Sequence, residues 1–188
     1  KNFIICAGYK GQMLKNFFDN SNDFLGYNIK VINTGLKSLT AKRLIKIKKI
    51  LPTVFCLTYG DAVSDINLNK LINYHKKKKS IFTITGVVPT SKYGSIKFNN
   101  KNKVTKFMEK KDFNKDFVSG GYFVLDKSIF KYLTKKNEML EKSPMEKIVK
   151  TGKMYIFKHN GFWQCMDTLR DKMLLDKMWK NKPKWKIW

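Results

Sequence analysis

Short apolar runs and stretches with helical spacing alternate along this chain of 188 residues. The runs predict strands, because four to eight apolar or alternating residues lead each time toward Gly, Asn, Asp or Pro; they cover 3–7, 27–33, 54–61 and 81–88. Apolar side chains recur every three or four residues in between, which predicts helices over 12–19, 41–50 and 68–78. The resulting order βαβαβαβ is typical of a mostly parallel sheet with helices on its faces.

The same pattern predicts the inward faces and ends of several elements. The helix over 41–50 should bury Leu44, Ile45, Ile47 and Ile50, and Asp65 should cap the helix over 68–78. Later segments predict a hairpin over 92–109, a strand over 117–125, short helices over 128–133 and 143–150, a strand over 153–158 and a closing helix over 168–180. The aromatic tail 183–188 is expected to dock on the body. With no internal repeat or linker, we expect one domain over 1–188 of α/β class, with a Rossmann-like, mostly parallel mixed sheet and flanking helices.

Two aspartates stand where a strand has just ended. Asp61 closes the run 54–61, and Asp167 follows the segment 154–166. Ligands of open α/β sheets lie beyond the carboxyl ends of strands, so the two carboxylates could share one hard cation such as Mg²⁺. That arrangement suits metal-assisted phosphoryl or nucleotidyl transfer. Two simpler readings remain: Asp61 as a turn residue, and Asp167 as the cap of the closing helix.

The composition indicates a globular protein in a reducing compartment. Apolar residues make up 43% of the chain, enough for a core, and no apolar run reaches the roughly 18 residues that span a bilayer. We therefore expect a cytoplasmic protein with no membrane partner. Cys6, Cys56 and Cys165 are predicted to be structural thiols, because they form neither a CxxC pair nor a cysteine–histidine cluster. His75 and His159 are interpreted as surface or strand-end residues.

The formal net charge of +25 raises the question of nucleic acid. Only Arg43 and Arg170 are arginine, however, although the bidentate guanidinium is favoured for phosphates and base edges. The lysines are scattered, and 76–79 is their only long run. We interpret the charge as a composition bias on solvated faces and expect no nucleic-acid partner; a non-catalytic basic module that binds nucleic acid is the alternative.

Five segments, taken together, resemble one known family. They are 3–11 (FIICAGYKG), 58–61 (TYGD), 107–110 (FMEK), 119–123 (SGGYF) and 161–171 (GFWQCMDTLRD). In this order they resemble the glucose-1-phosphate cytidylyltransferases, a branch of the sugar-nucleotide pyrophosphorylases. The resemblance runs from Lys1 to Trp188.

The resemblance implies a reaction and a set of site residues. CTP and glucose 1-phosphate would give CDP-glucose and pyrophosphate with Mg²⁺, in a full-length homo-oligomer that supplies sugars for surface polysaccharide. The implied metal ligands are Asp61 and Asp167. The implied nucleotide and substrate contacts are Ser38, Arg43 and the backbone of Gly60. On the sugar-phosphate side the resemblance implies Glu109 as acceptor of the sugar hydroxyls, Lys110 as the cation facing the phosphate, and Gly94 and Gly121 as pocket glycines.

Departures from the family pattern are concentrated around the nucleotide. The chain begins at Lys1, at the position of the family's second strand, without the first strand and glycine-rich loop. Ala41-Lys42 replace two glycines, and Lys111 replaces a proline. We therefore expect an N-terminally truncated fragment that is inactive by itself. A transferase that uses UTP, dTTP or GTP and a degenerate paralogue with a structural role remain alternatives.

Overall fold

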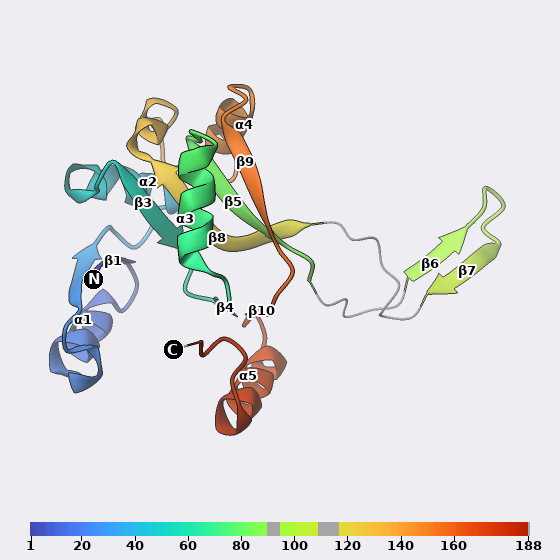
Figure 1. The fold of residues 1–188 in the computed structure, drawn as a ribbon, viewed down its shortest axis with the longest axis horizontal. Helices are drawn as coiled ribbons and strands as arrows, with labels where there is room; N and C mark the ends of the chain where they lie inside the picture. The colour runs from blue at the N-terminus through green and yellow to red at the C-terminus, as the bar shows by residue number, and fades with distance from the viewer. Residues whose placement is uncertain (90–94, 109–116, 188) are drawn as a thin grey trace. The chain divides into compact units, whose positions relative to one another are not determined.

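The computed structural model describes residues 1–89, 95–108 and 117–187 (Figure 1). The chain forms two compact units, each built from segments that are distant in the sequence. The first unit combines Lys1–Phe55 with Asp126–Lys153, and the second combines Cys56–Leu125 with Met154–Trp188. Compact units can belong to one folding domain; the single domain over 1–188 stays a prediction.

A βαβ segment begins the first unit. Strands β1 (Asn2–Ala7) and β2 (Asn28–Asn33) pair in parallel, with Ala7 opposite Asn33 at their carboxyl ends. Helix α1 (Gly11–Asn20) and the short 3₁₀ helix η1 (Asn22–Phe24) connect them. The predicted elements are confirmed here, but β1 is buried only at Ala7, and Phe3 is 46% exposed.

The rest of the first unit is helical. Helix α2 (Thr40–Ile47) continues as η2 (Lys48–Ile50), and the segments from 126 onward form η3 (Lys127–Lys131) and α4 (Ser143–Val149). Leu44 and Ile47 are buried as predicted, Ile45 is only half-buried, and the prediction that Ile50 is buried is wrong. The α-helix ends before Ile50, and the tighter 3₁₀ turn rotates the side chains that follow.

A mixed four-stranded sheet dominates the second unit. Its order is β3 (Val54–Thr58), β8 (Val118–Asp126), β5 (Phe82–Val87) and β9 (Met154–His159). Strand β5 runs parallel to β9 and antiparallel to β8, so the predicted α/β fold with a mixed sheet is confirmed. Phe82, Phe123 and Leu125 are fully buried side chains of this sheet. Helix α3 (Leu68–Lys77) precedes β5.

Smaller elements complete the second unit. Strands β4 (Ala62–Ser64) and β10 (Trp163–Cys165) pair antiparallel, as do β6 (Ser95–Phe98) and β7 (Val104–Met108). Helix α5 (Leu169–Asn181) closes the chain. In the tail, Trp185 stacks on Phe162 and on Trp179, which confirms that this segment docks.

Some sequence predictions about individual polar residues are wrong. Asp65 does not cap α3; the cap is Asn67, whose Oδ1 accepts the Lys70 amide at 2.9 Å. His75 is 2% exposed, and its Nδ1 lies 2.9 Å from the Thr83 hydroxyl, so it belongs to the core and not to the surface. A buried polar partner such as Thr83 makes a core position acceptable for an imidazole.

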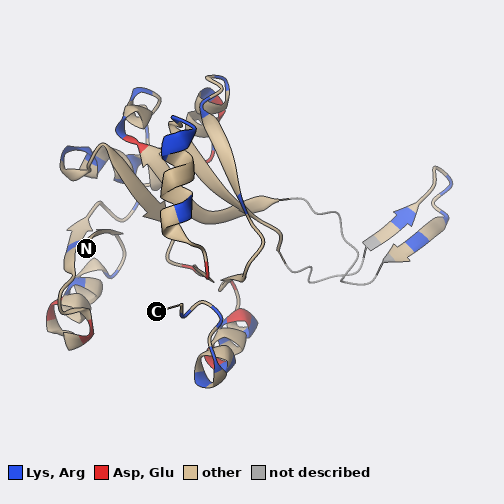
Figure 2. Cartoon of the chain, in the orientation of Figure 1, with Lys and Arg blue, Asp and Glu red and all other residues tan. Residues whose placement is uncertain are grey.

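Among the described residues, no helix is long and apolar enough to cross a bilayer. Lysines and arginines are spread over helices and strands of both units (Figure 2).

Candidate functional site

The β4–β10 ladder sets the positions of the two predicted metal ligands. Cys165 pairs with Ala62, and one step further the Met166 amide donates to the Asp61 carbonyl at 2.7 Å. Asp61 directly precedes β4, and Asp167 lies two residues after the end of β10, so both lie at the same end of this ladder. Both aspartates are exposed. The Cys165 thiol donates to Asp167 Oδ2 at 3.1 Å, which restrains that carboxylate.

Asp167 does not cap the closing helix. Thr168 is the N-cap of α5, and it forms a reciprocal capping box with Asp171. The capping alternative is therefore wrong, and the Asp167 carboxylate is available for another role. Asp61 lies in the turn between β3 and β4, as its simpler reading required.

A bulge in β8 lies next to this ladder. Ile84 pairs with Phe123 and Gly86 pairs with Ser119, so the single residue Thr85 lies opposite the three residues 120–122. Gly121 adopts φ +76°, a left-handed conformation that favours glycine. Bulges of this kind redirect side chains beside functional sites.

Each residue of the bulge contacts a different segment. The Gly120 carbonyl accepts the Trp163 indole N–H at 2.8 Å, and the Gly121 carbonyl accepts the Tyr59 amide at 3.3 Å. The Tyr122 hydroxyl donates to the Ala62 carbonyl at 2.8 Å. The bulge thereby joins β10, the end of β3 and the start of β4, and it brings Gly60, Asp61, Gly121 and Asp167 into one neighbourhood of the second unit.

The pKa of the Tyr122 phenol depends on the charge of Asp61. Burial, and secondly the negative charge of Asp61, raise the pKa of the Tyr122 phenol. The phenol is consequently neutral at physiological pH and can keep donating to Ala62. The Asp61 carboxylate lies near enough to affect it electrostatically.

The space available for a side chain differs between the glycines of this neighbourhood. A Cβ on Gly120 would come within 2.8 Å of Val87 Cγ1, so close packing excludes a side chain there. A Cβ on Gly60 would meet nothing within 4 Å. The space beside Gly60 is open, as a backbone approached by a ligand requires.

Ser38 and Arg43 belong to the first unit, where they bind the ends of β1 and β2. Arg43 Nη1 donates to the Ala7 carbonyl at 3.0 Å and also to the Thr34 hydroxyl. Ser38 donates to the Thr34 carbonyl, and Lys46 Nζ reaches the same carbonyl at 2.6 Å. In this structure both residues stabilise the loop after β2, and their predicted substrate contacts stay a prediction.

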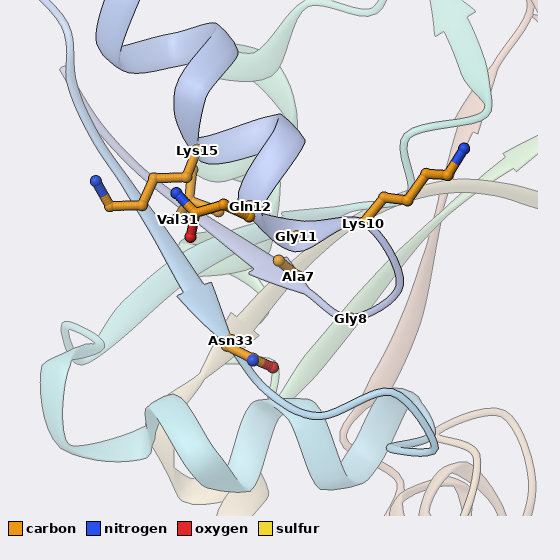
Figure 3. Close-up of a pocket in the computed structure, with 8 residues that line it drawn as sticks. All are labelled: Ala7, Gly8, Lys10, Gly11, Gln12, Lys15, Val31 and Asn33. Atoms are coloured by element: carbon orange, nitrogen blue, oxygen red, sulfur yellow. The ribbon is translucent and has the colours of Figure 1, made fainter.

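A cavity of about 340 Å³ also lies in the first unit, at the carboxyl ends of β1 and β2 (Figure 3). Its lining includes Gly8, Lys10, Gly11, Lys15 and Asn33. The Lys10 and Lys15 side chains extend in opposite directions and do not converge on a common ligand. None of the predicted site residues within the described ranges lines it.

Three predicted sugar-phosphate residues, Gly94, Glu109 and Lys110, lie outside the described residues. Among described residues, the structure adds Tyr122 and Cys165, which the sequence did not single out as site residues. The Gly-Gly pair within a strand is the signal that could have indicated Tyr122, since such glycines often mark a bulge.

The donors present suit a hard divalent cation. Two exposed carboxylates provide oxygen ligands, which Mg²⁺ prefers. In the described part of the chain, no group of three or more His, Cys, Asp or Glu residues gathers as a metal cluster. Mg²⁺ commonly keeps waters and substrate phosphates in its shell, so two carboxylates fit this ion better than Zn²⁺.

Comparison with known proteins defines the class. A family model described as Nucleotidyl transferase matches residues 1–180. The chain belongs to the nucleotidyl transferase family. Its fold is also that of HddC from Yersinia pseudotuberculosis, with a TM-score of 0.69 at 19% identity over 95% of this chain and 78% of that one. A putative glucose-1-phosphate thymidylyltransferase from Bacillus anthracis gives a TM-score of 0.63 at 14% identity, over 95% of this chain and 76% of that one.

Two relatives narrow the resemblance to one branch. A probable glucose-1-phosphate cytidylyltransferase of Bacillus subtilis (strain 168) is 33% identical over 99% of this chain and 81% of its own length. The glucose-1-phosphate cytidylyltransferase of Salmonella typhimurium is 32% identical over the whole of this chain and 82% of its own length. The resemblance drawn from the five sequence segments is confirmed.

Proposed function

We propose that this chain carries a glucose-1-phosphate cytidylyltransferase site, in which CTP and glucose 1-phosphate give CDP-glucose and pyrophosphate. The observation that carries the proposal is the placement of Asp61 and Asp167 at one end of the β4–β10 ladder. The names of the two relatives supply the substrates. An oxygen of the sugar phosphate attacks the α-phosphorus of CTP, the bond between the α-phosphorus and its bridging oxygen breaks, and pyrophosphate leaves.

The protein groups act by positioning and by charge. Mg²⁺ bound at this site would neutralise phosphate charge during the transfer. Asp61 and Asp167 would hold that ion, while the Cys165 thiol restrains Asp167 and Tyr122 fixes the start of β4 behind Asp61. No covalent intermediate on the protein is needed, so positioning and electrostatics provide the acceleration.

The remaining roles follow from the family resemblance. Gly60 leaves its backbone open to the nucleotide, and Gly121 lines the sugar pocket. Ser38 and Arg43 contact substrate in addition to holding the loop after β2. Gly94, Glu109 and Lys110 bind the sugar phosphate; they lie outside the described residues.

The setting of the reaction follows from its substrates. CTP is a cytoplasmic nucleotide, and three cysteines that form no disulfide fit a reducing compartment. We therefore place the protein in the cytoplasm, as a homo-oligomer, where its product would feed polysaccharide synthesis.

The test combines nucleotide binding with turnover. Calorimetry and pyrophosphate release are measured with CTP, UTP, dTTP and GTP, with and without Mg²⁺, for the parent chain and for Asp61→Asn and Asp167→Asn. Both substitutions should weaken Mg²⁺-dependent CTP binding by roughly 100-fold or turnover by at least as much, since a charged metal ligand is lost. Asp176→Asn is the matched control, because Asp176 pairs with Lys172 on the exposed face of α5.

Each outcome is informative. Preference for CTP supports the proposal, and preference for another nucleotide replaces CTP in it. CTP binding without turnover would agree with the predicted inactivity of the chain by itself. Binding that is independent of Mg²⁺ and of both aspartates would refute the site.

A further inference from the structure

A cluster around His159 joins the two loops that leave the far end of the β4–β10 ladder. One loop follows β4 and contains Asp65; the other connects β9 to β10 and contains 160–162. His159 Nε2 lies 2.9 Å from Asp65 Oδ1, 3.2 Å from Ser64 Oγ and 3.2 Å from the Phe162 carbonyl oxygen. One ring nitrogen is therefore shared by atoms of both loops.

The neighbours of this nitrogen indicate that it carries the hydrogen. A carboxylate and a carbonyl can only accept. The Ser64 hydroxyl directs its own hydrogen to the Phe162 carbonyl, at 2.8 Å, so its oxygen faces the ring as an acceptor as well. Nε2–H is the donor that this arrangement requires.

Burial makes this contact costly to lose. The His159 side chain is only 12% exposed, and that of Asp65 is 30% exposed. Asp65 Oδ1 is buried, and the described residues supply no well-aligned hydrogen-bond donor to it. The His159 ring nitrogen, at 2.9 Å, is a close polar contact of this oxygen, although its N–H is directed toward the Phe162 carbonyl.

Gly161 permits the close approach. A Cβ at this position would lie 2.4 Å from Asp65 Oδ1 and 2.7 Å from His159 Cε1. The Asp65 amide also donates to the Phe162 carbonyl at 3.2 Å, which adds a backbone contact between the same two loops. Any side chain at 161 would force the loops apart.

We propose that His159 is a positioning residue, which through Asp65 and Ser64 fixes the β4–β10 ladder and thereby the spacing of Asp61 and Asp167. The ladder is only three residue pairs long, so a contact at one end limits movement at the other. A ladder this short is marginal by itself and needs such support. The inference rests on the proposed metal role of the two aspartates.

Two variants open the cluster by different routes. His159→Ala removes the donor, and Gly161→Ala separates the loops without removing a charge. His159→Gln restores an N–H donor near the position of Nε2. Lys172→Ala, which removes an exposed ion pair on α5, is the control.

Two readouts are measured on the whole chain. Hydrogen exchange follows the amides of Asp65 and Met166, which bridge the loops and the ladder. Mn²⁺ binding, by electron paramagnetic resonance without substrate, reports on the carboxylate pair. His159→Ala and Gly161→Ala should speed exchange at both amides and weaken Mn²⁺ binding about tenfold, the low end for residues that support metal ligands. His159→Gln should recover at least half of each effect, and Lys172→Ala should change neither.

The outcomes separate this inference from the proposed function. If Asp61→Asn abolishes Mn²⁺ binding while His159→Ala binds normally and keeps its amide protection, the positioning role is refuted and the metal site stands. If Asp61→Asn leaves Mn²⁺ binding unchanged, the metal site is refuted, and faster exchange in His159→Ala would show that the cluster holds the ladder alone.

Discussion

Replacing Gly121 with alanine would place a Cβ on a residue whose φ is +76°. The nearest atom to that Cβ would be Tyr59 Cδ2 at 3.7 Å, an ordinary contact, so the cost comes from the backbone and not from a clash. A left-handed conformation costs an L-residue roughly 1–2 kcal/mol, about tenfold in the folding equilibrium. If the chain relaxed to negative φ instead, the hydrogen bond from the Tyr59 amide to Gly121 would be lost, and Gly60 and Asp61 would move.

Gly152 provides a matched control. Its φ is +67°, and a Cβ there would meet nothing within 4 Å, so Gly152→Ala should cost about the same in stability. It lies in the first unit, after α4, and outside the β8 bulge. Urea unfolding should therefore show losses of about 1–2 kcal/mol for both variants, whereas Mn²⁺ affinity should fall severalfold only in Gly121→Ala.

Two results would refute this reasoning. Equal Mn²⁺ affinity in the two variants would mean that the bulge does not position Asp61. A stability loss in Gly121→Ala that Gly121→Asn fails to reduce would mean that φ is not the cause, because asparagine tolerates the left-handed region better than alanine.

Three further predictions concern titration and capping. Partial burial raises the pKa of the Cys6 thiol from its ordinary value of 9.0, and the charge of Arg43 opposes this rise. The stability that this contributes is complete below pH 9 and is lost as pH rises beyond it. Unfolding under reducing conditions from pH 7 to 11 should therefore show a shallower decline in Cys6→Ala than in the parent chain. Tyr122→Phe should cost about 1 kcal/mol at pH 7 through the lost hydrogen bond to Ala62, and because the pKa of Tyr122 is raised from 10.0, the difference from the parent should narrow above pH 10; a constant difference up to pH 12 would contradict this. Thr168→Ala should destabilise α5 by about 1 kcal/mol in thermal unfolding, while Asp167→Asn should not, since Thr168 is the cap.

The periodic part of the fold could be predicted from the sequence. Strand and helix patterns placed β1, α1, β5 and α5 within one or two residues, because each depends on local spacing and on signals such as Gly, Asn and Pro. The order of elements predicted the α/β class with a mostly parallel sheet. The end of α2 at Ile47 was missed, because apolar spacing continues through Ile50 while the backbone tightens into 3₁₀ geometry.

Contacts formed only in the folded chain explain the residues whose positions the sequence reasoning predicted wrongly. Asp65 has the residue type of a helix cap, but its partner is His159, far along the chain. His75 has a surface-like polarity, but Thr83 satisfies it in the core. For the site, strand ends indicated Asp61 and Asp167. The role of Tyr122 depends on a bulge that only the Gly-Gly pair before it signals, and the role of Cys165 depends on a ladder that no local pattern encodes.

The β4–β10 ladder also bears on when this site can form during folding. The backbone bond from Met166 to Asp61 joins residues about 100 positions apart. Closing a loop of about 100 residues costs roughly 4 kcal/mol in chain entropy, which three residue pairs alone do not recover. On a ribosome, therefore, the two carboxylates can come together only after residue 167 has emerged and the sheet beside them has formed. A metal ion in the cell would therefore bind the proposed site only after the chain has folded, and its binding would contribute little to folding.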